Sequence, residues 1–187
     1  MSEIRISETD IKGLFLIDSF FSSDDRGKFA KVFERELYGG FGINFSLSET
    51  FISSSMKNVI RGMHFQLTGP QAKLVTVLSG HAFDVAVDLR VGSPTYKKWV
   101  GVELTGDNHC ALYIPRGFAH GFASMEDKTI MLYQCDGKYS KETDTGIVYN
   151  DPDLAIRWPI RDDDIVVSKR DKELPTFKQY SQKPMEV

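Results

Sequence analysis

The chain has 187 residues, with 23 Lys and Arg against 26 Asp and Glu, and 41% of its residues are hydrophobic. This length and composition fit one domain with a sizeable core, and exclude disordered, collagen-like and disulfide-stapled proteins. No run of basic residues marks a nucleic-acid surface, and no stretch reaches the roughly 18 apolar residues of a membrane span. We therefore expect one domain over residues 1–187, with neither nucleic acid nor membrane as a partner.

The cysteines and the N-terminus favour a cytoplasmic location. Cys110 and Cys135 lie far apart and show neither a zinc nor a thioredoxin spacing, which is typical of a reducing compartment. The first ten residues, MSEIRISETD, lack the apolar core of a signal peptide.

Apolar and polar residues alternate along most of the chain, as half-buried strands require. In residues 82–90, AFDVAVDLR, the odd-numbered positions from 83 to 89 are apolar, and Asp84 and Asp88 share the opposite face. Similar runs, bounded by turn-forming residues, occur at 14–21, 28–35, 43–52, 57–67, 72–79, 96–104, 110–114, 119–124 and 129–136. Short strands at this spacing predict an all-β sandwich or jelly roll.

Helix is expected only in short pieces, around residues 34–38 and 168–172. From about residue 178 the sequence KQYSQKPMEV is polar, so we expect a loose tail or a segment that needs a partner surface.

One histidine lies inside an expected strand rather than beside a turn. His64 belongs to NVIRGMHFQ, and strict alternation places it on a face with Ile60, Gly62 and Gln66. Such a histidine is compatible with a hydrogen-bonded core residue, so by itself it does not indicate a site.

Two further polar side chains share strand faces with apolar residues. Lys73 alternates with two valines, and a buried ammonium is unfavourable unless a charge meets it. Tyr133 shares a face with Met131 and Cys135, which is also typical of a core tyrosine with one hydrogen bond. A His, a Lys, a Tyr and inward carboxylates in one barrel are nevertheless more than a core needs.

The segment PRGFAHGF at 115–122 contains PxGxxH, half of the pattern of cupin jelly rolls. Metal-binding cupins carry an H-x-H pair followed by a glutamate, whereas this chain has His64-Phe65-Gln66 followed by Lys73. A divalent metal would lose ligands and meet a cation there. The spacing therefore indicates a cavity without metal, with acid–base chemistry.

Several segments appear in an ordered series: RGMHFQ at 61–66, QAKLV at 71–75, FDVAVDLR at 83–90, GSPT at 92–95, KWVGVEL at 98–104, IPRGFAHGF at 114–122 and NDPDLAIRWP at 150–159. With them the chain resembles the dTDP-4-dehydrorhamnose 3,5-epimerase family over most of its length, from Arg26-Gly27 to Asp171. The resemblance implies a cupin-type jelly roll with a few short helices, and an isomerase that uses no cofactor and no metal.

The resemblance also implies a reaction. Family members invert C3 and C5 of nucleoside-diphosphate 4-keto-6-deoxyhexoses in deoxysugar and polysaccharide biosynthesis, because the ketone acidifies the neighbouring hydrogens. By similarity His64 is the base, Asp171 orients it, Tyr133 is the acid and Lys73 stabilises the enolate. A neutral imidazole suits this task, since its unperturbed pKa is about 6.5.

Other residues carry over as contacts to the diphosphate, the sugar and the nucleobase, with Tyr139 matching the ring that stacks on the base. They are Arg26, Arg61, Gln66, His120, Tyr139, Asp144 and Arg170. The resemblance further implies a homodimer, to which the apolar run LFLIDSFF could contribute as an unpaired edge strand.

The chain departs from the family around the nucleotide. It has Lys31 where an acidic residue is usual, Glu49-Thr50-Phe51 in place of Gln-x-Asn, and Lys138 in place of the first of two tyrosines. These changes leave open a different nucleotide, with CDP as a candidate. Also open are a single-site epimerase or ketoisomerase, and a catalytically silent cupin that binds a sugar.

Overall fold

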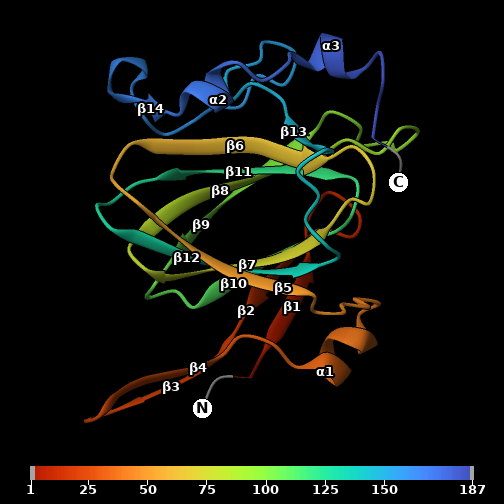
Figure 1. Ribbon diagram of the computed structural model, residues 1–187. Coiled ribbons are helices and arrows are strands. Elements are labelled where there is room, and N and C mark those ends of the chain that lie inside the picture. The colour runs from red at the N-terminus through yellow and green to blue at the C-terminus, as the bar shows by residue number, and fades with distance from the viewer. Residues whose placement is uncertain (1–2, 186–187) are drawn as a thin grey trace.

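The computed structural model describes residues 3–185, which form two large antiparallel sheets facing each other (Figure 1). One sheet has the order β1 (Arg5–Glu8), β2 (Phe15–Asp18), β10 (Cys110–Ile114), β7 (Ala72–Ser79), β12 (Thr129–Asp136) and β5 (Glu49–Ser55). The other has the order β13 (Asp144–Gly146), β6 (Val59–Gln66), β11 (Phe118–Ser124), β8 (His81–Asp88) and β9 (Trp99–Thr105), with β14 (Val166–Val167) parallel to β6. The predicted all-β sandwich is confirmed.

The main core lies between the two sheets, and a second core lies on the outer face of the sheet that contains β8 (His81–Asp88). Because side chains alternate along β8, this strand contributes to both. Ala82 and Ala86 face the interior between the sheets. Val85 and Val87 point to the outer face of their sheet, where they pack with residues of the C-terminal segment. The predicted face pattern of this strand is therefore confirmed, and β8 is buried on both sides.

The C-terminal segment covers the outer face of the sheet that contains β6 (Figure 1). It contains the 3₁₀ turn η1 (Asp162–Asp164) and the helices α2 (Lys169–Lys172) and α3 (Phe177–Tyr180). Tyr180 and Met185 are only 4% and 5% exposed, and the centroids of the Tyr180 and Phe65 rings are 5.1 Å apart. The stretch expected to be a loose tail, or to need a partner surface, is thus anchored on this sheet by Tyr180 and Met185, while residues 181–184 between them are exposed.

The N-terminal region differs from its prediction. The apolar run at 14–21 divides at Ser19 into β2 and β3 (Phe20–Asp24), and β3 forms a hairpin with β4 (Gly27–Lys31) that projects from the two sheets (Figure 1). Because β2 pairs with both β1 and β10, it is not an edge strand.

Helix α1 (Arg35–Gly40) follows the hairpin, close to the helical turn expected at 34–38. It packs its buried Tyr38 against the outer face of the β7 and β10 sheet, together with Ile43 and Phe45. The strand expected at 43–52 starts only at Glu49, since residues 43–48 follow this outer core instead. Within residues 3–185 no helix is long and apolar enough to cross a membrane.

Candidate active site

His64 of β6 is paired with a carboxylate from the other end of the chain. Its Nε2 lies 2.9 Å from Asp171 Oδ1, and Asp171 Oδ2 accepts a hydrogen bond from the Gly62 backbone N–H at 3.2 Å. Ser168 caps α2 by accepting a bond from the Asp171 backbone N–H, which fixes where that carboxylate points. Burial raises the pKa of Asp171, but the bonds from His64 and Gly62 outweigh burial and leave the pKa below its ordinary value.

A bulge next to His64 changes which side chains share its face. In the pairing of β6 with β11, His120 lies opposite His64 but Phe122 lies opposite Arg61, so β6 has one extra residue in this interval. Arg61 and His64 therefore line the same hollow although they are three residues apart. Strict alternation, which predicted His64 on a face with Ile60, does not hold across this bulge.

The facing sheet supplies Lys73 and Tyr133 to the same hollow. Its volume is about 230 Å³, and His64, Lys73 and Tyr133 all line it. The strand faces predicted for Lys73 and Tyr133 are confirmed, because their neighbours Val75, Val77, Met131 and Cys135 all belong to the interior core.

Lys73 is a charge without a fixed partner. Among the residues that the structure describes, its ammonium makes no hydrogen bond or ion pair. Burial lowers the pKa of Lys73, and the nearby Cys135, Asp144 and Asp84 oppose this effect. The ammonium is therefore available to a negative group that enters the hollow.

Tyr133 is only 6% exposed, and burial raises the pKa of its phenol well above the ordinary value. Its hydroxyl lies 3.5 Å from Ser53 Oγ. A phenol with a raised pKa is protonated at neutral pH, which is the state that a proton donor requires.

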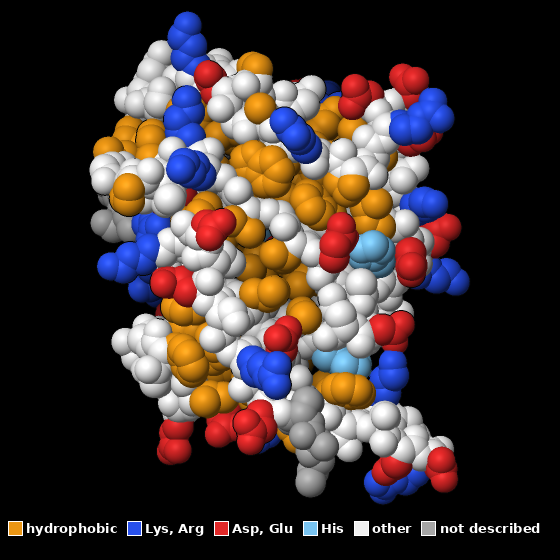
Figure 2. All heavy atoms as spheres, turned by 180° about the vertical axis from the view of Figure 1, so that it is seen from behind, with side chains coloured by type: hydrophobic (Ala, Val, Ile, Leu, Met, Phe, Trp, Pro, Cys, Tyr) orange, Lys and Arg blue, Asp and Glu red, His pale blue; other side chains and the backbone are white. Residues whose placement is uncertain are grey.

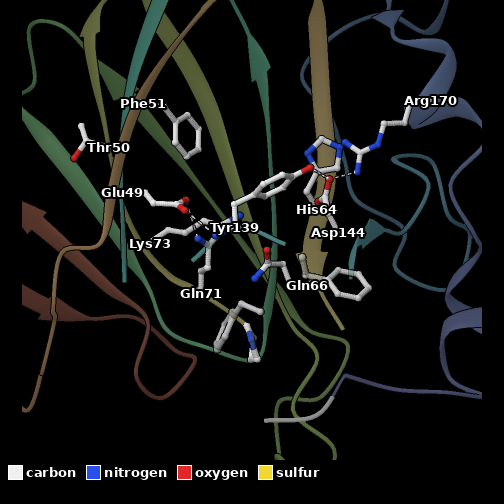
Figure 3. A pocket seen from close by; sticks show the side chains of 13 residues that line it. Glu49, Thr50, Phe51, His64, Gln66, Gln71, Lys73, Tyr139, Asp144 and Arg170 are labelled. Atoms are coloured by element: carbon white, nitrogen blue, oxygen red, sulfur yellow. Dashed lines mark hydrogen bonds and ion pairs between the residues drawn. The ribbon is translucent and has the colours of Figure 1, made fainter. Parts of the chain in front are cut away.

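A larger hollow of about 650 Å³ continues from the first, since both are lined by Phe51, His64 and Lys73. Its size lies within the range of about 300–1,000 Å³ that small-molecule sites occupy. Figure 3 shows Tyr139, Asp144 and Arg170 on its wall beside His64.

Asp144 accepts two bonds at one oxygen in this wall. Arg170 Nη2 donates at 2.7 Å, and the Tyr139 hydroxyl donates at 3.1 Å. Tyr139 is 55% exposed, which leaves its ring open to a planar ligand.

Gln66 lies in this wall, but the main chain occupies its amide. Its Nε2 donates to Gly69 O and Lys138 O at 2.8 and 3.1 Å, and its Oε1 accepts from the Ser140 backbone N–H at 2.6 Å. Gln66 therefore holds the loop that carries Tyr139. The sequence pattern did not indicate this role, which depends on a loop 72 residues away.

His120 forms a second imidazole–carboxylate pair in the wall of the smaller hollow. Its Nε2 lies 2.9 Å and 3.1 Å from the two oxygens of Asp84. The His120 and Asp84 side chains are 5% and 0% exposed. The alternation of β8 had pointed to Asp84 as an inward carboxylate, without identifying its partner.

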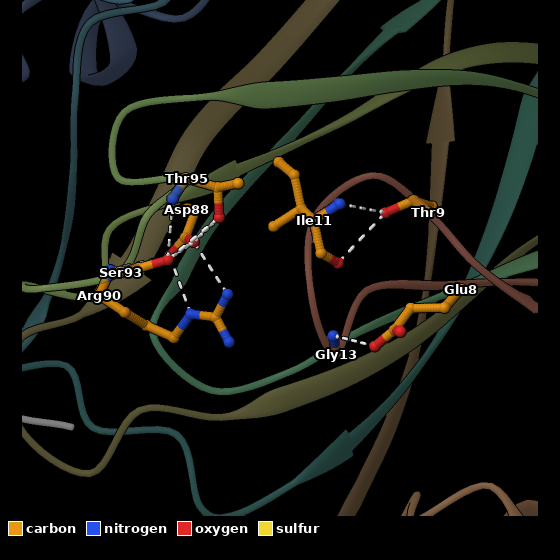
Figure 4. A network of polar contacts seen from close by, with 8 residues as sticks. All are labelled: Glu8, Thr9, Ile11, Gly13, Asp88, Arg90, Ser93 and Thr95. Carbon is orange, nitrogen blue, oxygen red and sulfur yellow. Dashed lines mark hydrogen bonds and ion pairs between the residues drawn. The ribbon is translucent and has the colours of Figure 1, made fainter.

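Asp88, which the sequence placed on the same face as Asp84, does not line either hollow. It closes the turn after β8 by accepting bonds from Arg90, Ser93 and Thr95, drawn on the left of Figure 4. Asp88 is therefore a structural residue, because each carboxylate oxygen is occupied by a fixed donor.

Arg26, predicted to contact substrate, is separate from both hollows in the single chain. It lies at the turn of the β3–β4 hairpin, its side chain is 90% exposed, and it pairs with Asp24. Figure 2 shows charged side chains gathered at the free end of this hairpin.

The departures from the family pattern differ in where they lie. Lys31, which pairs with Glu34, and Lys138 line neither hollow, whereas Glu49, Thr50 and Phe51 line the larger one. Phe51 also lines the smaller hollow and stacks on Tyr133, a contact that the sequence did not indicate. Finding it would have required the register of β5 against β12.

Within the described residues no group of three or more His, Cys, Asp or Glu is placed to hold a metal ion. The site instead has an imidazole on one sheet and a phenol and an ammonium on the other, all lining one hollow. This arrangement in a jelly roll is that of an acid–base isomerase, a carbohydrate epimerase of the cupin type.

Comparisons with known proteins give the family. The family model described as dTDP-4-dehydrorhamnose 3,5-epimerase matches residues 8–179. The dTDP-4-dehydrorhamnose 3,5-epimerase of Methanothermobacter thermautotrophicus is 40% identical over 173 residues, which cover 92% of this chain and 94% of that protein. The chain belongs to the dTDP-4-dehydrorhamnose 3,5-epimerase family.

Solved structures show the same fold. The dTDP-6-deoxy-D-glucose-3,5-epimerase of Legionella pneumophila, in complex with dTDP-4-keto-L-rhamnose, has a TM-score of 0.93 and 37% identity, covering 99% of this chain and 100% of that one. A 3'-monoepimerase of Streptomyces bikiniensis, in complex with dTDP-quinovose, has a TM-score of 0.85 and 31% identity, covering 93% and 88%.

Proposed function

We propose that this protein inverts C3, C5 or both in a nucleoside-diphosphate 4-keto-6-deoxyhexose, in the biosynthesis of deoxysugars and polysaccharides. The observation that carries the proposal is the placement of His64 and Tyr133 on facing sheets, with both side chains and Lys73 lining one hollow. Inversion at a carbon beside a ketone needs a base on one face and an acid on the other, and this hollow offers both.

The proton transfers balance without any further reactant. His64 removes the hydrogen from the carbon beside the ketone, and the electron pair moves onto the ketone oxygen to give an enolate. Asp171 stabilises the imidazolium, and Lys73 neutralises the enolate oxygen. Tyr133 then donates its proton to the other face of the carbon. Solvent afterwards returns a proton to Tyr133 and accepts the proton that His64 has taken.

The contributions that such groups usually make to a reaction rate suit these roles. A positioned base or acid contributes about 10²–10⁴-fold to a rate, and one donor at a developing oxyanion contributes roughly 3–4 kcal/mol. Because Lys73 has no fixed partner in the described structure, its charge can be paired when the enolate forms.

The larger hollow is the proposed place of the nucleotide. Arg170 can grip a diphosphate oxygen and Tyr139 can stack on the base, since guanidinium groups bind phosphate bidentately and aromatic rings stack on bases. Gln66 supports the Tyr139 loop, while Arg61 and His120, in the wall of the smaller hollow, are proposed contacts to the sugar.

The number of inverted carbons is a separate question. The relatives include 3,5-epimerases and a 3'-monoepimerase that share this fold, so inversion at one carbon is the second candidate. Incubation in heavy water with a panel of nucleotide-linked 4-keto sugars, followed by NMR at C3 and C5, tests the proposal. Deuterium uptake with inversion supports it, and no uptake with any substrate favours a silent sugar-binding cupin.

The nucleotide is proposed to be thymidine-linked, as in the ligands of the solved relatives. CDP is the alternative, because Glu49, Thr50 and Phe51 replace the usual Gln-x-Asn in the wall of the larger hollow. A thermal-shift comparison of dTDP and CDP distinguishes them, since a ligand that binds the native state raises the melting temperature. Stabilisation by dTDP alone excludes CDP.

A cytoplasmic homodimer is also part of the proposal. The β3–β4 hairpin projects from the sheets with Phe29 62% exposed, and Arg26 on its turn would need a second chain to meet a substrate hollow. Sedimentation velocity tests the dimer. The Michaelis constant of Arg26→Ala tests whether Arg26 contacts the substrate.

A further inference from the structure

Phe51 stacks on Tyr133, the proposed acid. The two residues are direct partners in the pairing of β5 with β12. Their ring centroids are 4.6 Å apart and their planes differ by 13°. The Tyr133 ring also meets the His120 ring, with the centroids 5.9 Å apart and the planes at 67°. The phenol thus contacts two rings.

Hydrogen bonds hold Tyr133 less firmly than these rings do. Its hydroxyl accepts from Ser53 Oγ only at 3.5 Å, a long contact, and donates to Met131 Sδ, a weak acceptor, at 3.7 Å. The orientation of the phenol therefore depends on the stacked ring of Phe51.

Phe51 also faces the hollow in which the reaction is proposed to occur. It is 47% exposed, lines both the smaller and the larger hollow, and stands on the sheet opposite His64 (Figure 3). In the described structure β5 ends its sheet, so Phe51 belongs to an edge strand with no neighbour beyond it.

We propose that Phe51 is a positioning residue that holds Tyr133 where it protonates the carbon on the face opposite His64. This inference rests on the proposed function and adds to it a determinant of stereochemical outcome. Phe51 acts through Tyr133, and it governs how often proton removal ends in inversion rather than in return of a proton to the same face.

Two isotopic outcomes separate these events. When His64 removes a hydrogen, exchanges it with heavy water and returns deuterium to the same face, the sugar is labelled with retention. When Tyr133 delivers the deuterium, the sugar is labelled with inversion. The ratio of inverted to total labelled sugar therefore reports the placement of Tyr133, whereas total labelling reports His64.

The test compares Phe51→Ala with two variants. Phe51→Tyr keeps an aromatic ring, and Ile52→Ala changes the next residue of β5, which is 61% exposed and lines neither hollow. We expect the ratio to fall about tenfold or more in Phe51→Ala, because small misplacements of catalytic groups reduce rates strongly. Phe51→Tyr and Ile52→Ala should keep the wild-type ratio.

An unchanged ratio in Phe51→Ala would overturn the proposal. So would an equal loss of retention and inversion with a raised Michaelis constant, which would assign Phe51 to substrate binding alone. If the wild-type protein labels none of the sugars, the proposed function fails instead.

A measurement without substrate decides the positioning role in every case. With 3-fluorotyrosine incorporated, the Tyr133 resonance is identified by its loss in Tyr133→Phe. We expect one sharp ¹⁹F resonance in the wild type and Ile52→Ala, and a broadened or divided one in Phe51→Ala. A resonance that stays sharp and unshifted in Phe51→Ala would contradict the proposal.

Discussion

The two histidines that line the smaller hollow, His64 and His120, each pair with a carboxylate, and the two pairs differ in what surrounds them. His64 and His120 lie opposite each other on β6 and β11, and each Nε2 is 2.9 Å from a carboxylate oxygen. The His64 side chain is 26% exposed, whereas that of His120 is 5% exposed. Equal distances therefore do not imply equal roles, because a base needs an accessible face as well as a partner.

The two carboxylates also differ in how far they lie in sequence from the histidines that they pair with, 36 residues for Asp84 and 107 for Asp171. Asp84 lies on β8, directly beside β11, so one strand pairing brings it to His120. Asp171 is 107 residues from His64 and reaches it only because the capped helix α2 packs over β6. The buried pair, His120 with Asp84, therefore lies within one sheet. The open pair, His64 with Asp171, joins a strand to a helix from the other end of the chain.

The largest expected effect is on catalysis at the open pair. His64→Ala should reduce deuterium uptake by about 10²–10⁴-fold, the usual contribution of a positioned base. The matched control is His81→Ala, which removes a histidine that pairs with Glu103 and lines neither hollow in which the reaction is proposed. Uptake near the wild-type rate in His64→Ala would show that His64 is not the base.

The pair of His120 and Asp84 should affect stability, in addition to the sugar contact proposed for His120. Asp84→Ala leaves the His120 ring without its acceptor and creates a small cavity, so we expect a loss of about 2–4 kcal/mol in the free energy of unfolding. Urea unfolding measures it, with His64→Ala as the comparison. Equal destabilisation by the two changes would remove the distinction between the pairs.

Asp171→Asn tests the partner in the open pair. Loss of one hydrogen bond to a charged group, worth about 1.5–3 kcal/mol, should lower the rate of inversion by roughly 10- to 100-fold. Because the pKa of Asp171 is below its ordinary value, its contribution to stability is present above about pH 4 and is lost as the pH falls through the lower folded-state pKa. The stability difference between wild type and variant should therefore shrink at acid pH, and a constant difference would contradict this.

Asp88 is a buried carboxylate that is bonded by Arg90, Ser93 and Thr95 rather than by a histidine. Burial raises its pKa, but the bonds from Arg90, Ser93 and Thr95 outweigh burial and lower the pKa to about 2. Its contribution of about 2 kcal/mol is present above pH 4 and disappears as the pH falls towards 2. Urea titrations of wild type and Asp88→Asn between pH 2 and 5 measure it; inversion at neutral pH should stay unchanged in the variant, since Asp88 lines neither hollow.

Strand faces were the part of the site that local sequence predicted well. The alternation around Lys73 and Tyr133 placed both side chains inward, and it described both faces of β8. It did not hold at His64, because the bulge in β6 adds a residue that no local pattern reveals. The packed C-terminal segment was missed for a similar reason, since its contacts are with residues far away in the chain.

The sequence by itself determined the alternating strands, the family and the set of polar residues from which a site could be built. These follow from side-chain periodicity and from residues that stand next to one another. The pairing of Asp171 with His64 was implied by the family resemblance, and the tertiary structure shows the contact. Only the tertiary structure decided that Gln66 holds the Tyr139 loop and that Phe51 stacks on Tyr133. Such contacts depend on strand register and on packing between distant segments, which the whole chain fixes together.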